Sequence, residues 1–545
     1  MGLGGFWRKA RQLFDDPTLR YWLLGRLAGK WKPVEVPTRT TPPYLAGVVQ
    51  LSADPLVTNI ESADVQKPNF PMKLNLPGGQ CQLTPGHANL PFDASHKDTE
   101  TLLALHRFSW CADVDPSWTY ELWQEWCDLY GNNDDLWAWQ PYTTAERLIY
   151  LTRCIHRYGM PKNRDQTLEV LGKHGQKIFS KLEYYGEKYT GNHLANNGRG
   201  LYLGGLLWDR RDWYEVGKKI LIEESKRIFS QSGTLKEGSV HYHFLVWSWY
   251  EECWQDALSS KLMESKELKK IANNAAKAAQ YLCLPGGIPL IGDVSPDCPP
   301  SVLYDKLNFG EATEKKVKSA KFIADGWLRA GNQKWDGLWH ADPAGWSSLP
   351  GHGHRDYGSF ELHYGSTPVL VDLGRRSYEA IGDQDLSSKG HNMLMVDDVE
   401  PYPPNKPYYT QKFRDSVGGS HRVIYQLPRG VEVEHDGFSR LTDVGTHRRT
   451  WAFNGQEVAI TDFIDGSGTH KIEIFFHTQL PVKYDQKNIK LGEFTLCADG
   501  EIDLKSAKMW REYGRGEPAT RVIISKRVKL PNTSTITIVA DNDSM

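Results

Sequence analysis

The sequence predicts an α+β protein built from a helical domain followed by an antiparallel β-sandwich. Two observations carry this prediction. Apolar residues recur at helical spacing between about residues 100 and 285, and they alternate every second position after about residue 335. The chain has 545 residues, 40% of them apolar, which suits a globular protein of more than one domain. We therefore expect three segments, at residues 1–100, 101–335 and 336–545.

The first segment, residues 1–100, is predicted to be an N-terminal extension. Residues 6–30 are a candidate basic amphipathic helix, which we expect to pack on the protein itself rather than on a membrane surface. Residues 31–100 are rich in Pro, Gly and Asn, which favours irregular structure with short strands. The start of the chain has no continuous apolar region and no small-residue cleavage site, so we expect no signal peptide. A cytoplasmic location is the default expectation, with the periplasm or secretion left open.

The second segment, residues 101–335, is predicted to be helical. Stretches such as SWTYELWQEWCDLY and TTAERLIYLTRCIHRYG place apolar residues at i, i+3, i+4 and i+7, and short breaks with Gly, Pro, Asn and Asp separate them. Up to about residue 285 this pattern indicates eight to ten helices. Short loops between antiparallel helices favour a stacked or toroidal array. No strict repeat of solenoid length is visible.

The third segment, residues 336–545, is predicted to be the β-sandwich. Runs such as GSFELHYG, TPVLVDLG and KIEIFFHTQL alternate in polarity, and turn residues separate them at short intervals. Many short strands with regular turns are typical of two packed antiparallel sheets.

The composition excludes several classes of protein. The 65 Lys and Arg balance 67 Asp and Glu, so no bulk positive charge points to nucleic acid. The eight cysteines form no CxxC pair, which argues against a disulfide framework and a thiolate zinc site. No run of 18 apolar residues predicts a transmembrane span. Phosphate-binding and serine-hydrolase motifs are not found. The oligomeric state stays open.

Aromatic residues are abundant, with 20 Trp, 25 Tyr and 18 Phe. Some of them fill cores. An excess of Trp also suits sugar rings, which stack on aromatic faces, so both interpretations stay open.

Two helical motifs contain candidate catalytic residues. In GNHLANN, Asn192 and His193 can present donors to a carboxylate, although polar residues at a helix start often serve only as caps. In EGSVHYH, Tyr242 and His243 can donate or accept a proton, and the alternative is an aromatic helix face.

A third motif, Gly351-His352-Gly353-His354, opens the sandwich. If this stretch is extended, its two histidines point to the same side. Asp372 follows at a predicted strand end, and His391 follows a loop. Two imidazoles and one carboxylate favour zinc over calcium, and the alternative is a set of separate hydrogen-bonded residues.

Taken in order, the motifs resemble the heparinase II/III-like polysaccharide lyases. The resemblance covers about residues 100–480 and is most specific in GHGHRDYGSFELHYGSTPVLVDLG and KGHNMLMVDD. It implies an incomplete (α/α) toroid followed by an antiparallel β-sandwich. It also implies cleavage of a uronic-acid polysaccharide, such as a glycosaminoglycan or a bacterial exopolysaccharide, by β-elimination.

The resemblance implies a role for each matching residue. Asn192 and His193 would neutralise the substrate carboxylate, Tyr242 would be the base, and His352 would be an acid or a charge stabiliser. A structural divalent metal, zinc by preference, would be held by His354, Asp372 and His391. The general acid stays open between Tyr242, His352 and Tyr378, because Arg375 and Arg376 follow the Asp372 turn. The candidate substrate-binding residues are Trp139, Tyr142, Asn196, His243, Arg355 and Arg449.

Two other functions remain as alternatives. A glycoside hydrolase on the same toroid needs two carboxylates, and the candidates in the helical half are Glu237, Asp293 and Asp297. A non-catalytic glycan-binding or assembly protein in surface-polysaccharide production would use the aromatic residues equally well.

Overall fold

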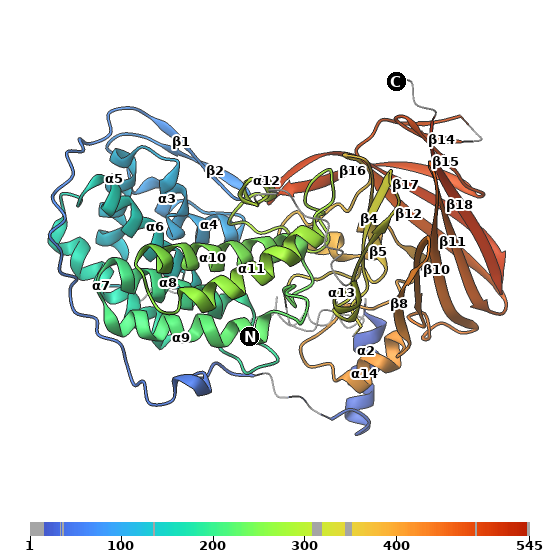
Figure 1. Ribbon diagram of the computed structural model, residues 1–545, viewed down its shortest axis with the longest axis horizontal. Coiled ribbons are helices and arrows are strands. Elements are labelled where there is room, and N and C mark those ends of the chain that lie inside the picture. The colour runs from blue at the N-terminus through green and yellow to red at the C-terminus, as the bar shows by residue number, and fades with distance from the viewer. Residues whose placement is uncertain are drawn as a thin grey trace.

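The computed structural model describes residues 16–32, 34, 37–133, 137–307, 319–343, 351–485 and 488–541. Figure 1 shows a domain of helices lying beside a domain of antiparallel sheets. The predicted fold class is therefore confirmed. Within the described residues, no helix is long and apolar enough to cross a membrane.

The helical domain contains eight helices between Thr99 and Leu282 in its described part, as the periodicity predicted. Caps read from the sequence set several of their starts. A proline at the first position, where its missing N–H costs nothing, opens both α5 and α6. The helices are α3 (Leu90–Asp93), α4 (Thr99–Arg107), α5 (Pro116–Tyr130), α6 (Pro141–Tyr158), α7 (Arg164–Ser180), α8 (Asn192–Leu207), α9 (Arg211–Ile228), α10 (Val240–Ser259), α11 (Ser265–Leu282), α12 (Pro300–Lys306) and α13 (Ser319–Ala324).

The sheet domain holds three antiparallel sheets in the described residues. The first is a four-stranded sheet in the order β3 (Trp327–Gly331), β4 (Trp335–His340), β5 (Ser359–Tyr364) and β6 (Thr367–Leu370). The second has the order β16 (Glu501–Glu512), β17 (Arg515–Lys529), β12 (Thr469–Thr478) and β7 (Leu394–Val396). The third has the order β13 (Val482–Tyr484), β14 (Ile489–Leu491), β15 (Phe494–Cys497), β18 (Asn532–Ala540), β11 (Glu457–Gly466), β10 (Val444–Asn454), β9 (Gly430–His435) and β8 (Arg422–Leu427).

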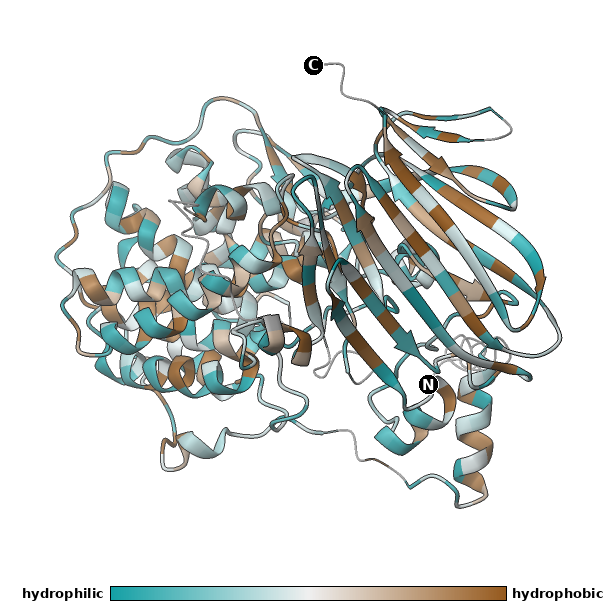
Figure 2. Ribbon diagram, turned by 45° about the vertical axis from the view of Figure 1, so that its right-hand side comes forward, coloured by the Kyte–Doolittle hydropathy of each residue, from teal (hydrophilic) through white to brown (hydrophobic). Residues whose placement is uncertain are grey.

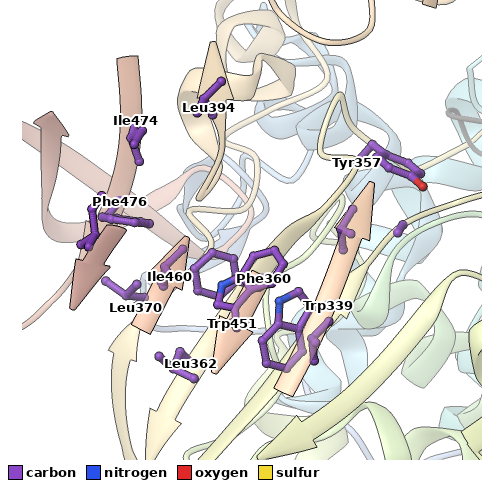
Figure 3. Packing of buried hydrophobic residues seen from close by; sticks show 14 of the residues in the cluster. Trp339, Tyr357, Phe360, Leu362, Leu370, Leu394, Trp451, Ile460, Ile474 and Phe476 are labelled. Atoms are coloured by element: carbon purple, nitrogen blue, oxygen red, sulfur yellow. The ribbon is translucent and has the colours of Figure 1, made fainter. Parts of the chain in front are cut away.

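The core of the sheet domain lies between these sheets. Apolar and polar residues alternate along the long strands in Figure 2, because successive side chains point to opposite faces. At the centre Trp339, Phe360 and Trp451 meet edge to face or stacked, with Trp339 and Trp451 centroids 5.4 Å apart (Figure 3). Helix α14 (Gln411–Gly418) packs against this domain.

The N-terminal segment does not form a unit of its own. Helix α2 (Pro17–Leu27), within the predicted 6–30 helix, buries Trp22 in the core of the sheet domain, while residues 6–15 lie outside the described residues. The hairpin of β1 (Met72–Leu76) and β2 (Gly79–Leu83) instead joins the core of the helical domain. Strand β3 begins at Trp327, before the boundary expected at residue 336. The sequence did not predict this strand, because the five-residue run WLRAG is too short to show alternation.

The two domains are joined by specific contacts near the start of α4. The carboxylate of Asp98 caps α4 and also accepts hydrogen bonds from Ser377 Oγ at 2.7 Å and Tyr513 OH at 3.2 Å. Glu379 accepts hydrogen bonds from the backbone N–H and the hydroxyl of Thr99. These contacts place the loop after β6 against the helical domain.

Candidate functional site

The candidate site lies where two helix starts of one domain meet two loops of the other. Asn192 is the first residue of α8, and Tyr242 lies in the first turn of α10, whose N-cap Ser239 accepts a hydrogen bond from the Tyr242 N–H. The loop before β5 contributes His352, and the loop after β6 contributes Tyr378. Both domains therefore supply polar groups to one place.

Asn192 is held by a buried carboxylate. Its amide Nδ2 donates to Glu237 Oε2 at 2.6 Å and lies 3.3 Å from His352 Nε2. Asn192 Oδ1 and Glu237 Oε1 are both buried without a hydrogen-bond partner among the described residues. Buried polar atoms normally find partners, so this pair has spare capacity for a ligand.

His352 is oriented by Asp293. The imidazole Nδ1 donates to Asp293 Oδ2 at 3.0 Å, which leaves Nε2 as the unprotonated nitrogen that faces Asn192. Asp293 also accepts hydrogen bonds from His354 Nε2 at 2.8 Å and from Arg375 Nη1 at 3.2 Å. Burial alone would raise the pKa of Asp293, but the hydrogen bonds from His352 and His354 and the Arg375 charge hold it well below its usual range.

Tyr242 joins His352 to a second tyrosine. The rings of Tyr242 and His352 are stacked with centroids 3.4 Å apart and 8° between their planes. The Tyr242 hydroxyl lies 2.5 Å from the hydroxyl of Tyr378. Burial raises the pKa of both phenols well above the ordinary value. The negative charge of Asp297 raises the pKa of Tyr242 further, and Tyr242 raises the pKa of Tyr378 further. Both tyrosines are therefore neutral and able to donate.

His193 lies at the edge of the site with about half of its side chain exposed. Its Nδ1 is 3.0 Å from Glu183 Oε1, and its ring centroid is 4.7 Å from that of Tyr142. Burial opposes the charge on His193, but Glu183 outweighs it and raises the pKa of the imidazole. The Tyr142 hydroxyl donates to Asp297, which also pairs with Arg107 at 2.7 Å.

The structure thus gathers Asn192, Tyr242 and His352 in one cluster, with His193 and Tyr142 paired beside each other. Other predicted substrate-binding residues lie elsewhere. Trp139 is buried in the helical core and donates to the Tyr130 carbonyl, so the structure does not bring it to the cluster. His243 is also structural, because its two nitrogens pair with Leu235 N–H and the Ala275 carbonyl.

The remaining predicted substrate-binding residues form internal pairs. Asn196 is buried and accepts from Arg199, and Arg355 pairs with Glu400. Arg449 is buried in the sandwich and pairs with Asp462. The structure does not bring these three residues to the cluster, and their role as substrate ligands stays a prediction from the sequence.

The predicted metal ligands His354 and His391 lie near one another, with ring centroids 5.1 Å apart, and His354 Nδ1 is buried without a partner among the described residues. Asp372 Oδ2 accepts from His391 Nδ1 at 2.7 Å, whereas the buried nitrogen of His391 without a partner is Nε2, on the other side of the ring. His354 uses Nε2 for Asp293. Among the described residues no group of three or more His, Cys, Asp or Glu side chains is placed to hold a metal. Zinc stays a prediction from the sequence, and no step below depends on it.

Several residues of the cluster carried no site assignment from the sequence. Glu237 and Asp293 appeared only as acids for a hydrolase, yet here each orients a neighbouring side chain. Glu183 had no signal at all, because the sequence does not show which carboxylate meets His193.

Comparisons with known proteins address the domain and the fold. Residues 315–540 match the family model described as Heparinase II/III-like, C-terminal. A solved structure of a heparinase III superimposes with a TM-score of 0.62 at 16% identity, covering 97% of this chain and 94% of that chain. No curated protein matches the chain.

Two further solved structures share the fold. The heparinase III that is the BT4657 gene product gives a TM-score of 0.55 at 15% identity, covering 83% of this chain and 80% of that one. A mutant of the heparan sulfate lyase HepC from Pedobacter heparinus gives 0.51 at 15% identity, covering 87% and 82%. These likenesses show the fold, a helical toroid followed by antiparallel β-sheets, and the family model describes the C-terminal domain.

Proposed function

We propose that this chain, whose residues 315–540 form a heparinase II/III-like C-terminal domain, is a polysaccharide lyase that cleaves a uronic-acid polysaccharide by β-elimination. An enzyme of the polysaccharide-lyase type is what the family match and the fold support together. The observation that carries the proposal is the cluster of Asn192, Tyr242 and His352 between the two domains.

The first requirement of the reaction is neutralisation of the uronate carboxylate. The C5 proton is weakly acidic while that carboxylate is charged, and donors aimed at it stabilise the enolate-like transition state. We assign this task to the Asn192 amide, which Glu237 holds in place, and to His193, whose pKa Glu183 raises.

The second requirement is a pair of proton-transfer groups. We assign the base to His352, because Asp293 occupies Nδ1 and leaves Nε2 with a free lone pair. When Asn192 turns to the substrate carboxylate, this nitrogen is free to take the C5 proton. The C4–O4 bond then breaks, a C4–C5 double bond forms, and O4 receives a proton.

We assign the proton on O4 to Tyr242, whose raised pKa keeps the hydroxyl protonated until the oxyanion forms. Tyr378 returns a proton across the short contact between the two hydroxyls. This assignment exchanges the two roles that the resemblance implied for Tyr242 and His352. It also gives Tyr378 a place in the proton path.

The test is the formation of a product with a C4–C5 double bond, which is monitored by its ultraviolet absorbance. Purified protein is incubated with heparan sulfate, hyaluronan, chondroitin sulfate, alginate and polyglucuronate. A rise with one polymer supports β-elimination and identifies the sugar. Products that lack the double bond favour a hydrolase. Binding of a polymer without any product favours the non-catalytic function and overturns the proposal.

The matched variants are Tyr242→Phe and Tyr425→Phe. Tyr242→Phe removes the donor of the O4 proton, so we expect kcat to fall by about 100-fold or more with the fold retained. Tyr425 is half exposed on β8 and serves as the control for loss of a phenol. Full activity of the Tyr242→Phe protein would refute the assignment.

A further inference from the structure

A lysine-rich groove lies on the helical domain, outside the catalytic cluster. It runs between α9 and α11, which are neighbours in Figure 1, and has a volume of about 800 Å³. We call it the basic groove. Its cationic lining is Lys226 of α9 and Lys266, Lys269, Lys270 and Lys277 of α11.

The charge of the basic groove is poorly neutralised by the protein itself. Lys266, Lys270 and Lys277 are exposed and have no ion-pair partner among the described residues. Glu267 is the one carboxylate among the described residues that line the groove. The whole chain has a formal net charge of −2, so this local excess of positive charge is not a general property of the surface.

The lysines form a stripe rather than a point. Lys266, Lys270 and Lys277 lie on one face of α11, since helix neighbours on a face are three and four residues apart, and they span about 16 Å. Asn273 and Asn274 lie in the same lining and add amide groups between the charges. A linear ligand with repeated negative charges and hydroxyl groups fits this pattern.

A second cavity adjoins the basic groove. Ser230 lines both the groove and this cavity, which has a volume of about 230 Å³ and lies at the boundary of the two domains. Two carboxylates, Asp325 and Asp342, also line the cavity. The excess of positive charge therefore belongs to the groove itself.

We propose that the basic groove binds a stretch of acidic polysaccharide, carrying carboxylate or sulfate groups, at a distance from the bond that is cleaved. Lysine acts here as a point charge with a flexible stem, which suits repeated anions whose exact spacing varies. The proposal deepens the proposed function and rests on it for the identity of the bound chain. The groove would hold long chains on the helical domain.

The test measures binding without cleavage. In a Tyr242→Phe background, the three substitutions Lys266→Glu, Lys270→Glu and Lys277→Glu are combined. Fluorescence anisotropy follows a labelled long heparin chain, a labelled long hyaluronan chain and a labelled heparin tetrasaccharide at physiological salt. The control variant carries Lys483→Glu, Lys505→Glu and Lys529→Glu, which make the same charge change at exposed positions of the sheet domain.

We expect the groove variant to bind one or both long chains about ten-fold more weakly, while the control changes little. If only heparin binding is weakened, sulfate is the group that the groove binds. If the binding of both heparin and hyaluronan is weakened, the carboxylate is that group. We expect a smaller loss for the tetrasaccharide, because it carries fewer anionic groups than the long chains. With Tyr242 restored, KM for the long chain should rise in the groove variant, with the larger change in KM than in kcat.

Three outcomes would overturn the proposal. They are unchanged long-chain binding in the groove variant, equal losses in the groove and control variants, and tighter binding of a DNA duplex than of either glycan. Because the assay needs no product, it stays readable if the ultraviolet assay rejects β-elimination. Circular dichroism of both variants checks that they are folded.

Discussion

The contact between Tyr242 and Tyr378 is the most direct residue-level link between the two domains. If Tyr378 acts only through Tyr242, the effects of the two residues are not additive. We expect Tyr378→Phe to lower kcat by about ten-fold, and the double variant with Tyr242→Phe to lose no more than Tyr242→Phe alone. Steady-state kinetics on the four proteins measures this cycle. Additive losses would show that the tyrosines act separately.

The charge on His193 predicts a pH dependence. His193 is protonated below its pKa, and Glu183 raises that pKa, so carboxylate neutralisation is lost as the pH rises through it. Glu183→Gln removes the cause of the shift. We expect the alkaline limb of kcat/KM to move to lower pH in this variant, measured from pH 5 to 9. If the alkaline limb of kcat/KM does not move, a group other than His193 causes the loss of activity at high pH.

Asp293 predicts the tautomer of His352. Asp293→Asn keeps the size of the side chain but presents an amide to three donors, so His352 loses the acceptor for its Nδ1 proton. We expect kcat to fall by about 100-fold or more, with a smaller change in KM. Nitrogen-15 NMR of the imidazole reports which nitrogen is protonated. An unchanged tautomer would contradict the assigned role of Asp293.

At the residue scale the sequence predicted the residues that the structure gathers in the cluster better than the residues that orient them. Asn192, Tyr242 and His352 belong to short motifs with unusual composition, so spacing and resemblance singled them out. Sequence alone could not place Trp139, because a buried indole and a sugar-stacking indole are the same residue. Asp293 orients His352 from 59 residues away, a contact that the order of residues does not encode.

At the scale of elements, α6 shows why its motif is structural. Arg147 is fully buried, donates from Nη1 to the carbonyls of His106 and Ala138 at 2.8 Å, and lies 4.0 Å from the Trp126 ring centroid. Burial lowers the pKa of its guanidinium to about 9. Within this motif, Arg147 therefore holds helices together.

This packing predicts a stability change. Arg147→Ala leaves two buried carbonyls without donors, so we expect the free energy of unfolding to fall by about 3 kcal/mol. Urea denaturation followed by circular dichroism measures it. The control is Arg157→Ala, at an exposed position of the same helix, with an expected change within about 0.5 kcal/mol. Equal effects would mean that the Arg147 hydrogen bonds contribute nothing.

The helices and long strands were predictable because their periodicities extend over many residues. Strand β3 and the placement of α2 were not. A five-residue strand shows too few alternations, and the sheet domain that buries Trp22 lies hundreds of residues away in the sequence. Short elements take their structure from partners rather than from their own pattern.

At the scale of the whole molecule, the contacts around Asp98 predict coupling between domain placement and activity. Tyr513 OH donates to Asp98 and accepts the Tyr378 N–H at 2.9 Å. Ser377→Ala combined with Tyr513→Phe removes these contacts and leaves the Asp98 cap of α4 in place. We expect kcat/KM to fall about ten-fold, because reacting groups on opposite domains lose their alignment.

Small-angle scattering and thermal unfolding complete that measurement. A larger radius of gyration with a nearly unchanged Tm is the expected pattern for loosened domains. A lower Tm with unchanged kinetics would mean that the contacts only stabilise the fold.

The division of the catalytic cluster between two domains has a consequence for inheritance. Asn192 and Tyr242 come from the toroid, whereas His352 and Tyr378 come from the sandwich, so neither domain carries a working half. A chimera that takes one domain from a distant relative would join two sets of residues that never adapted to each other. Selection therefore acts on the contacts between the two domains, and the residues on both sides must change together.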